Sequence, residues 1–379
     1  MNSVKYCLFI FSFLLVSSCN FFRPLIYNFP NQSDVKKFDF RKIEGADKSA
    51  KFSFFRSFDT LQEIKHVTLE NKGMNSTNVP LNGFVSLHNT ISMIIIRNDS
   101  ILYENYTSGY NNESSVASFS VAKAYVTMLV GIAIQDGLIK NVNQPITDFI
   151  DEWKGKSGYD KITIRHLLVH TSGLRLNTSK TGAVKDESTF YYANNLREDI
   201  LKCKIVEEPG IHFDYENENT SLLGLILERV TKKTLSSYLE EKLWKKIGTE
   251  SAALWSTDRD DSLAIEKSFC CINARTIDFA KFARLLLKKG NWDGEQIIPA
   301  AWIEEATSSA IELGEKPTYG YNLAIGPKEY GSYFAIGLYG QILYIYPKKN
   351  LIIVRFGNTD INYNPNYWKE IMLQISDQL

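Results

Sequence analysis

Two β-hairpin patterns at opposite ends of a long helical region constrain the fold of this chain more than any other feature. Each pattern consists of two short apolar runs, rich in β-branched and aromatic residues, separated by turn residues, which is typical of hairpins. The turns are Asn98-Asp99-Ser100 and Pro347-Lys348-Lys349-Asn350. The predicted strands are Ile91–Arg97, Ile101–Tyr106, Gln341–Tyr346 and Leu351–Phe356.

Helical patterns dominate the sequence between about residues 141 and 310. The predicted helices are Thr163–Val169, Asn219–Val230, Leu235–Ile247 and Ala274–Lys289, with a closing helix around Trp368–Ile375. Strands at both ends of a helical middle favour one sheet to which the N- and C-terminal segments both contribute. We therefore expect an α+β fold, an antiparallel β-sheet flanked by helices, with an inserted mainly helical lobe at about 141–310.

The first 19 residues are typical of an export signal. Lys5 gives a positive start, Cys7–Val16 is apolar but too short for a spanning helix, and Ser17-Ser18-Cys19 follows. This resembles a bacterial lipoprotein signal, in which cleavage leaves Cys19 as the lipidated N-terminus; an ordinary secretory signal is the alternative. We expect a protein of the bacterial cell envelope, anchored by lipid, with its folded domain outside the cytoplasm.

The domain boundaries follow from these patterns. Residues 20–83 have weak periodicity, so we expect a tether followed by irregular or short β structure. Residues 84–379 form the remaining domain. The 43 basic and 43 acidic residues leave no net charge, which argues against a nucleic-acid partner; the sequence does not predict an oligomeric state.

Cysteine usage predicts neither a disulfide framework nor a metal site. After removal of Cys7 and lipidation of Cys19, an odd number remains: Cys203, Cys270 and Cys271. Adjacent cysteines rarely form a disulfide with each other, so at most one disulfide among these three cysteines remains possible. No cysteine and histidine cluster has the spacing of metal ligands, and we expect neither a metal nor another cofactor.

Ser120-Val121-Ala122-Lys123 is the first candidate catalytic motif, and it opens the apolar run Tyr125–Ile134. On a helix, residues three apart share one face, with Cβ atoms about 5–6 Å apart. A lysine held away from water can then act as the base that activates a serine hydroxyl. A second copy, Ser33-Asp34-Val35-Lys36, has no apolar helix behind it, and we interpret it as chance.

Tyr215-Glu216-Asn217 is the second candidate motif. It follows the turn Glu208-Pro209-Gly210 and precedes a predicted helix, a position where catalytic groups tend to lie. Two further Tyr-x-Asn copies occur. Tyr103 is expected to be an alternating strand residue and Tyr192 an aromatic packing residue.

Together with Thr163-Ile164-Arg165-His166-Leu167-Leu168-Val169-His170-Thr171-Ser172-Gly173-Leu174, these motifs resemble the serine β-lactamase and penicillin-binding-protein superfamily, in particular its class C-like branch. The resemblance spans about Ile91 to Gly357. It implies that Ser120 is the nucleophile and that Lys123 and Tyr215 share the proton transfers. It also implies that Asn217 positions Lys123 or the substrate by hydrogen bonding.

The third motif of this superfamily is Lys-Thr-Gly or His-x-Gly. The literal Lys180-Thr181-Gly182 precedes Tyr215 and lacks strand character, so the positional match is Ala335-Ile336-Gly337-Leu338. Alanine replaces the basic first residue, which removes a contact to a substrate carboxylate of about 1.5–3 kcal/mol. The resemblance still implies that Gly337 lets the backbone approach the substrate and that the Ser120 and Leu338 amides form the oxyanion hole.

The Gly-x-x-Gly-Gln form at Gly337–Gln341 points to a branch of the superfamily. It resembles the 6-aminohexanoate-oligomer hydrolase and EstB-like esterase branch, as do three further strings: Leu254–Asp258, Ile272–Ala280 and Pro299–Trp302. This implies a small-molecule amide or ester substrate, with Gln341 either contacting it or tying the strand. A penicillin-binding-protein-like peptidase and a catalytically silent surface binding module are the alternatives.

His170 raises the question of a Ser-His-Asp triad. No Gly-x-Ser-x-Gly elbow surrounds any serine of the chain. We therefore predict a packing and capping role for His170, and a solvated side chain for Glu216.

Overall fold

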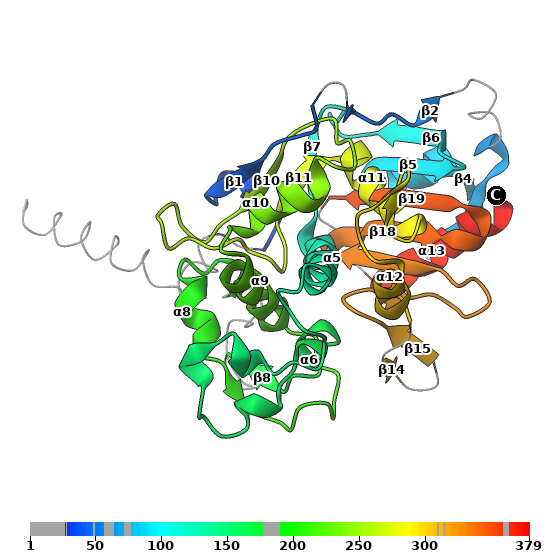
Figure 1. Cartoon of the computed structure of the whole chain (residues 1–379). Helices are drawn as coiled ribbons and strands as arrows, with labels where there is room; N and C mark the ends of the chain where they lie inside the picture. Colours follow the sequence, from blue (N-terminus) through cyan, green and yellow to red (C-terminus); the bar gives the residue numbers. More distant parts are fainter. Residues whose placement is uncertain are drawn as a thin grey trace, which may run out of the picture.

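The computed structural model describes residues 27, 29–47, 50–56, 64–71, 77–176, 190–308, 311–313, 316–358 and 364–379. Cys19 with the whole candidate signal, and Lys180-Thr181-Gly182, lie outside the described residues. Figure 1 shows a large sheet with helices packed against it on one side of the molecule and a mainly helical lobe on the other, with helix α5 between them. Within the described ranges, no helix combines the length and apolar character needed to cross a membrane.

The main sheet has nine strands in the order β14-β15-β16-β17-β18-β19-β5-β6-β2. Neighbouring strands in this sheet pair antiparallel, except β2 and β6, which pair parallel. Its central strands are β5 (Thr90–Arg97), β6 (Ser100–Tyr106), β17 (Tyr333–Gly337), β18 (Gln341–Tyr346) and β19 (Leu351–Gly357). Because β19 pairs with β5, the N- and C-terminal hairpins share one sheet, as the sequence predicts.

Both faces of this sheet are covered, which explains the unbroken apolar runs of its central strands. In β5, Ile94 and Ile96 pack into the core that contains α5 and α11 (Thr276–Leu287). Met93 and Ile95 point to the opposite face, where α4 (Leu81–Leu87) and α13 (Pro365–Gln378) lie. The closing helix predicted around Trp368–Ile375 is therefore α13, extended at both ends.

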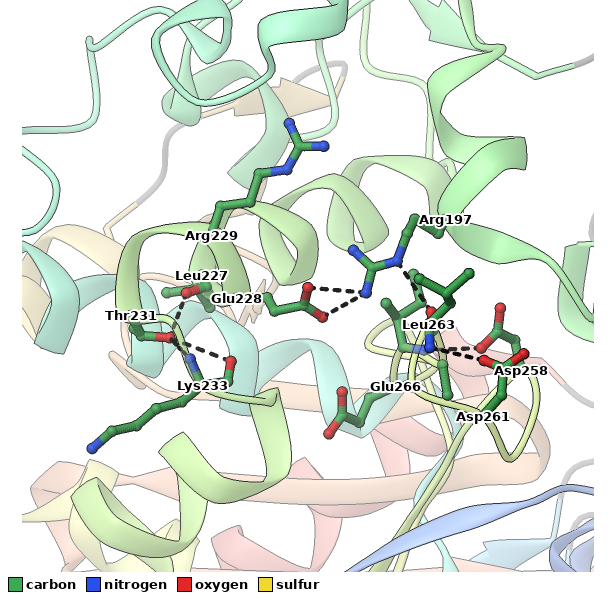
Figure 2. Close-up of polar contacts among 12 residues, drawn as sticks. Arg197, Leu227, Glu228, Arg229, Thr231, Lys233, Asp258, Asp261, Leu263 and Glu266 are labelled. Carbon is green, nitrogen blue, oxygen red and sulfur yellow. Dashed lines mark hydrogen bonds and ion pairs between the residues drawn. The ribbon is translucent and has the colours of Figure 1, made fainter.

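The helical lobe contains α6 (Ile164–Leu168), α8 (Leu196–Leu201), α9 (Asn217–Thr231) and α10 (Leu235–Leu239), with a π-helical turn at Glu240–Trp244. Arg197 of α8 fastens the lobe to the loop that leads from β10 to β11: it donates to Leu263 O (3.1 Å) and to Glu228 Oε2 of α9 (3.0 Å), as Figure 2 shows.

A second, four-stranded antiparallel sheet lies beside the lobe, in the order β1 (Phe40–Ile43), β10 (Ala253–Ser256), β11 (Ile272–Arg275), β7 (Ser115–Ala117). It changes one predicted boundary. Ala274 and Arg275 pair with β7, so the helix predicted from Ala274 begins only at Thr276.

Helix α5 (Ala122–Gln135) is buried over most of its length between sheet and lobe. Helix α12 (Ala300–Ala306) packs on it through Trp302, whose indole Nε1 donates to Thr127 O (3.1 Å). A Cβ atom at Gly131 would lie 2.3 Å from the Trp302 ring, so glycine permits this close contact. The helix that carries Lys123 and directly follows the candidate nucleophile Ser120 is thus held by packing on several sides.

The remaining described strands are short. They are β2 (Phe55–Arg56), β3 (Thr68–Asn71), β4 (Thr77–Pro80), β8 (Leu174–Arg175), β9 (Lys204–Ile205), β12 (Asn291–Trp292), β13 (Glu295–Gln296), β14 (Ile311–Leu313), β15 (Lys316–Tyr319) and β16 (Ala324–Ile325). Several of them belong to residues 20–83, for which the sequence predicts irregular or short β structure.

Candidate active site

Ser120 and Lys123 lie together where a single 3-10 turn, η4 (Phe119–Val121), runs into α5. The Lys123 Nζ atom is 3.0 Å from Ser120 Oγ. Lys123 is only 1% exposed, whereas Ser120 is half-buried. The hydroxyl therefore reaches the edge of the site while the amine lies beneath it.

Two further oxygen atoms surround the Lys123 amine. Its Nζ donates to Asn217 Oδ1 (2.8 Å) at the start of α9 and to the Phe269 carbonyl (2.9 Å) in the β10–β11 loop. Neither acceptor carries a proton, so both must receive an N–H from the lysine. The third direction of the amine faces Ser120 Oγ, toward which a protonated Lys123 donates and from which a neutral Lys123 accepts.

Tyr215 covers this amine from the solvent side. The Lys123 Nζ atom lies 4.8 Å from the centroid of the Tyr215 ring. Tyr215 is 39% exposed, the largest exposure among the three predicted catalytic residues. The structure thus brings Ser120, Lys123, Tyr215 and Asn217 into one cluster.

His170 holds the segment that carries Tyr215. Its ring stacks on the Tyr215 ring with the centroids 4.5 Å apart. Its carbonyl accepts from Asp214 N (2.8 Å), and its Nδ1 accepts from Glu216 N (3.2 Å). The two residues flanking Tyr215 are therefore both tied to His170, which is a positioning role.

The other side of the His170 ring is tied to α5. Its Nε2 lies 2.9 Å from Asn322 Oδ1, and Asn322 Nδ2 donates to Thr127 Oγ1 (3.0 Å) of α5. Because Nδ1 accepts a backbone N–H, the imidazole is neutral with its proton on Nε2. Burial and the nearby Lys123 lower the pKa of His170 to about 3.

Arg175 constrains the same segment from outside. Its Nε donates to Asp214 Oδ2 (2.8 Å) and lies 3.6 Å from Glu216 Oε1. The Glu216 side chain is thus paired with an arginine and only partly solvated, which modifies the prediction made for it. Tyr215 sits between two acidic residues that share one cation.

Gly337 brings strand β17 against the nucleophile. A Cβ atom at this position would lie 2.6 Å from Ser118 O and 3.1 Å from Ser120 N, so only glycine allows this approach. Leu338 follows directly, at the start of the turn η9 (Leu338–Gly340). Ala335, at the position of the superfamily's basic residue, is 1% exposed.

Gln341 does not line the site. It is fully buried, its Nε2 donates to Gly357 O (3.0 Å), and its Oε1 accepts from Gly357 N (2.6 Å). Of the two roles open from sequence, substrate contact and strand tie, this geometry favours the strand tie, because the amide group is already bonded to the backbone of β19.

The second Ser-x-x-Lys copy is not arranged for catalysis. Ser33 Oγ donates to Asn31 Oδ1 (2.5 Å), within the cap of the turn η1 (Gln32–Lys36). In the described part of the chain, no hydrogen bond joins the side chains of Ser33 and Lys36.

The other Tyr-x-Asn copies have the packing roles predicted for them. Tyr103 lies in β6 and donates to Asn82 Oδ1 (2.8 Å). Tyr192 is fully buried and donates to Asp34 Oδ2 (3.0 Å).

The cysteines pair in a way that the sequence does not predict. Adjacent Cys270 and Cys271 form a disulfide with their Cα atoms 3.7 Å apart, directly after Phe269, whose carbonyl binds Lys123. Cys203 is a buried free thiol, and burial raises its pKa well above the usual range. Across the described ranges, no group of three or more His, Cys, Asp or Glu side chains is placed to hold a metal ion.

Comparison with known proteins finds a matching family model and similar proteins. The family model described as Beta-lactamase matches residues 88–373. The 6-aminohexanoate-dimer hydrolase of Paenarthrobacter ureafaciens is 24% identical over 302 residues, covering 71% of this chain and 72% of that protein.

Two solved structures share the fold. A 6-aminohexanoate-dimer hydrolase homologue from Bacillus anthracis superposes with a TM-score of 0.78 at 22% identity, covering 92% of each chain. A penicillin-binding protein from Bacillus halodurans superposes with a TM-score of 0.63 at 16% identity, covering 79% of this chain and 100% of that one.

The neutral, buried His170 makes stability depend on pH. Between about pH 6.5, where an unfolded histidine titrates, and about pH 3, the unfolded chain binds a proton at His170 that the folded protein does not. Stability from this residue is therefore present above about pH 6.5 and is lost as the pH falls. We predict that the deficit of His170→Gln in unfolding free energy, measured by urea denaturation, is about 2 kcal/mol smaller at pH 5 than at pH 7.

A deficit that stays the same at both pH values would contradict this prediction. It would mean that the folded protein takes up a proton at His170 as readily as the unfolded chain does.

Proposed function

Since the chain belongs to the beta-lactamase family, a family of hydrolases, we propose that it is a serine hydrolase that cleaves small amides or esters through an acyl-enzyme on Ser120. The observation that carries the proposal is the buried Lys123 amine 3.0 Å from the half-buried Ser120 hydroxyl.

The first step is attack of Ser120 Oγ on the substrate carbonyl. Lys123 donates two N–H groups, one to Asn217 Oδ1 and one to the Phe269 carbonyl. The lone pair of a neutral Lys123 therefore points at the serine proton. It accepts that proton as the oxygen–carbon bond forms. We assign to Tyr215, whose ring lies 4.8 Å from this amine, the transfer of a proton to the leaving group.

The second requirement is stabilisation of the oxyanion. The Ser120 amide lies in the turn before α5, next to Gly337, and the Leu338 amide directly follows Gly337, the last residue of β17. Two backbone donors that converge on one point stabilise the negative charge of a tetrahedral intermediate by about 3–4 kcal/mol each. Water then attacks the acyl-enzyme, with Lys123 and Tyr215 reversing their roles.

The substrate class rests on the relatives and on Ala335. The named hydrolase among the relatives acts on 6-aminohexanoate dimer. A small buried alanine supplies no cation where the superfamily holds a substrate carboxylate, and this favours substrates without a carboxylate at that point. The missing cation therefore favours small amides and esters over cell-wall peptides.

We also propose that the protein is exported and tethered to a membrane of the bacterial envelope by lipid on Cys19. The positive start, the short apolar run and Cys19 support this proposal. One acyl chain binds a membrane only marginally, so stable anchoring requires more than one.

The full-length chain, expressed in a bacterium fed an alkyne fatty acid, is predicted to carry the label and to sediment with membranes. Cys19→Ser should remove both properties. A mature N-terminus at another residue, without label, would refute the anchor and leave the catalytic proposal untouched.

For the reaction itself, we predict that protein lacking residues 1–19 reacts with a fluorophosphonate probe at Ser120, identified by peptide mass spectrometry. Lys123→Met should lose labelling, since the serine then has no base. Ser120→Ala should lose turnover of small esters to below about a thousandth of wild type with an almost unchanged melting temperature. Ser86→Ala is the control, because Ser86 is an exposed serine of α4, on the opposite face of the main sheet, and this variant should label normally.

Each rival function has its own outcome. Covalent capture of a fluorescent penicillin, with no turnover of small esters or amides, would favour a cell-wall peptidase. Folded protein in which no electrophile labels Ser120 would favour a silent binding module and overturn the proposal.

A further inference from the structure

Building on the proposed function, we infer that Gln32 is a positioning residue of the active site: from the N-terminal segment it fixes the spacing of the two backbone segments that carry the oxyanion-hole amides. We call residues 30–34 the N-terminal clasp. Gln32 contacts no reacting atom, so its effect is exerted through the strands that it joins.

Gln32 bridges the ends of two strands from different sheets. Its Oε1 accepts from Ala117 N (2.7 Å), and its Nε2 donates to Gly357 O (3.0 Å). Ala117 is the last residue of β7, three positions before Ser120. Gly357 is the last residue of β19. One amide group thus ties the backbone that enters the nucleophile turn to the main sheet.

Gly357 continues the connection to the second amide. Gly357 O also accepts from Gln341 Nε2, and Gly357 N donates to Gln341 Oε1. Gln341 directly follows the turn η9, whose first residue is Leu338. The path from Ala117 to Gln341 therefore consists of two glutamine amides that share one backbone carbonyl.

A second contact of the clasp reaches the same turn. Tyr339 OH donates to Pro30 O (2.6 Å), and the Tyr339 ring packs edge-on against Phe119 with the centroids 5.6 Å apart. Phe119 and Tyr339 both have left-handed backbone conformations, with φ of 43° and 62°. They are the immediate neighbours of Ser120 and Leu338. Such conformations persist only where surrounding contacts hold them.

The clasp is itself held rigidly. Asn31 N donates to Asp34 Oδ2, and Ser33 N donates to Asn31 Oδ1, both at 3.0 Å. Asp34, 2% exposed, also accepts from Tyr192 OH of the helical lobe (3.0 Å). Because the clasp is anchored, the position of Gln32 is fixed. The spacing of the Ser120 and Leu338 amides therefore depends on the clasp.

The test compares Gln32→Leu with a glutamine that has the same bonding pattern elsewhere. Gln378 accepts from Thr68 N (3.0 Å) and donates to Thr68 O (2.8 Å), joining α13 to β3 on the opposite face of the sheet. Gln378→Leu therefore measures the cost in stability of losing such a bridge. Melting temperature, the rate constant for fluorophosphonate labelling of Ser120, and kcat and KM for a small ester are measured for both variants.

We expect Gln32→Leu to slow Ser120 labelling and lower kcat by about 10- to 100-fold with little change in KM, because misplaced oxyanion donors act on the transition state. Gln378→Leu should keep wild-type rates. Tyr339→Phe, which removes only the hydroxyl bonded to Pro30, should also slow labelling, and it decides the matter if Gln32→Leu does not fold.

Two results would overturn the inference. The first is a wild-type labelling rate and kcat in folded Gln32→Leu or, if Gln32→Leu does not fold, in Tyr339→Phe. The second is a loss of labelling rate and kcat in Gln378→Leu equal to that in Gln32→Leu. Both leave the proposed function standing, provided that wild-type Ser120 is labelled. Absence of labelling in folded wild type overturns the proposed function itself, and the role of Gln32 with it.

Discussion

The buried amine of Lys123 is the interaction on which the rest of the site depends. Removing an amine from water costs several kcal/mol unless its hydrogen bonds are replaced. Here three oxygen atoms replace them, from Ser120, Asn217 and Phe269. These residues belong to three different segments, so the amine is satisfied only when the helical lobe and the β10–β11 loop are both docked on α5. Folding and assembly of the candidate site are therefore the same event.

Two further networks extend this dependence outward. On the tyrosine side, Thr127, Asn322 and His170 link α5 to the backbone around Tyr215. On the oxyanion side, Gln32 and Gln341 meet at Gly357. Each network holds a group to which the proposed mechanism assigns a role in the transition state, and in that mechanism the linking residues themselves do not contact substrate. A rigid arrangement of this kind is what electrostatic stabilisation of an oxyanion requires.

The sequence predicts most of the local structure and the identity of the central residues. Both hairpins lie where alternating apolar runs and turn residues place them, and Ser120, Lys123, Tyr215 and Asn217 form one cluster. Periodicity and motif order are properties of the sequence alone, so they can be recognised without knowledge of tertiary contacts.

Contacts made by the backbone, or by residues far apart in sequence, are not visible in such patterns. The Phe269 carbonyl is a backbone group, so no residue type in the sequence indicates that it binds Lys123. Gln341 could be either a substrate ligand or a strand tie until its bonds to Gly357 are known. The strand assignment of Ala274 and the Cys270–Cys271 bridge likewise depend on partners or geometry that local sequence does not specify.

The most direct test of the account is a crystal structure of the protein after reaction with a small phosphonate ester. The account predicts a bond between Ser120 Oγ and phosphorus, with the phosphonyl oxygen about 2.7–3.1 Å from the amide nitrogens of both Ser120 and Leu338. An adduct on another residue, or a phosphonyl oxygen that points away from these two amides into solvent, would contradict it.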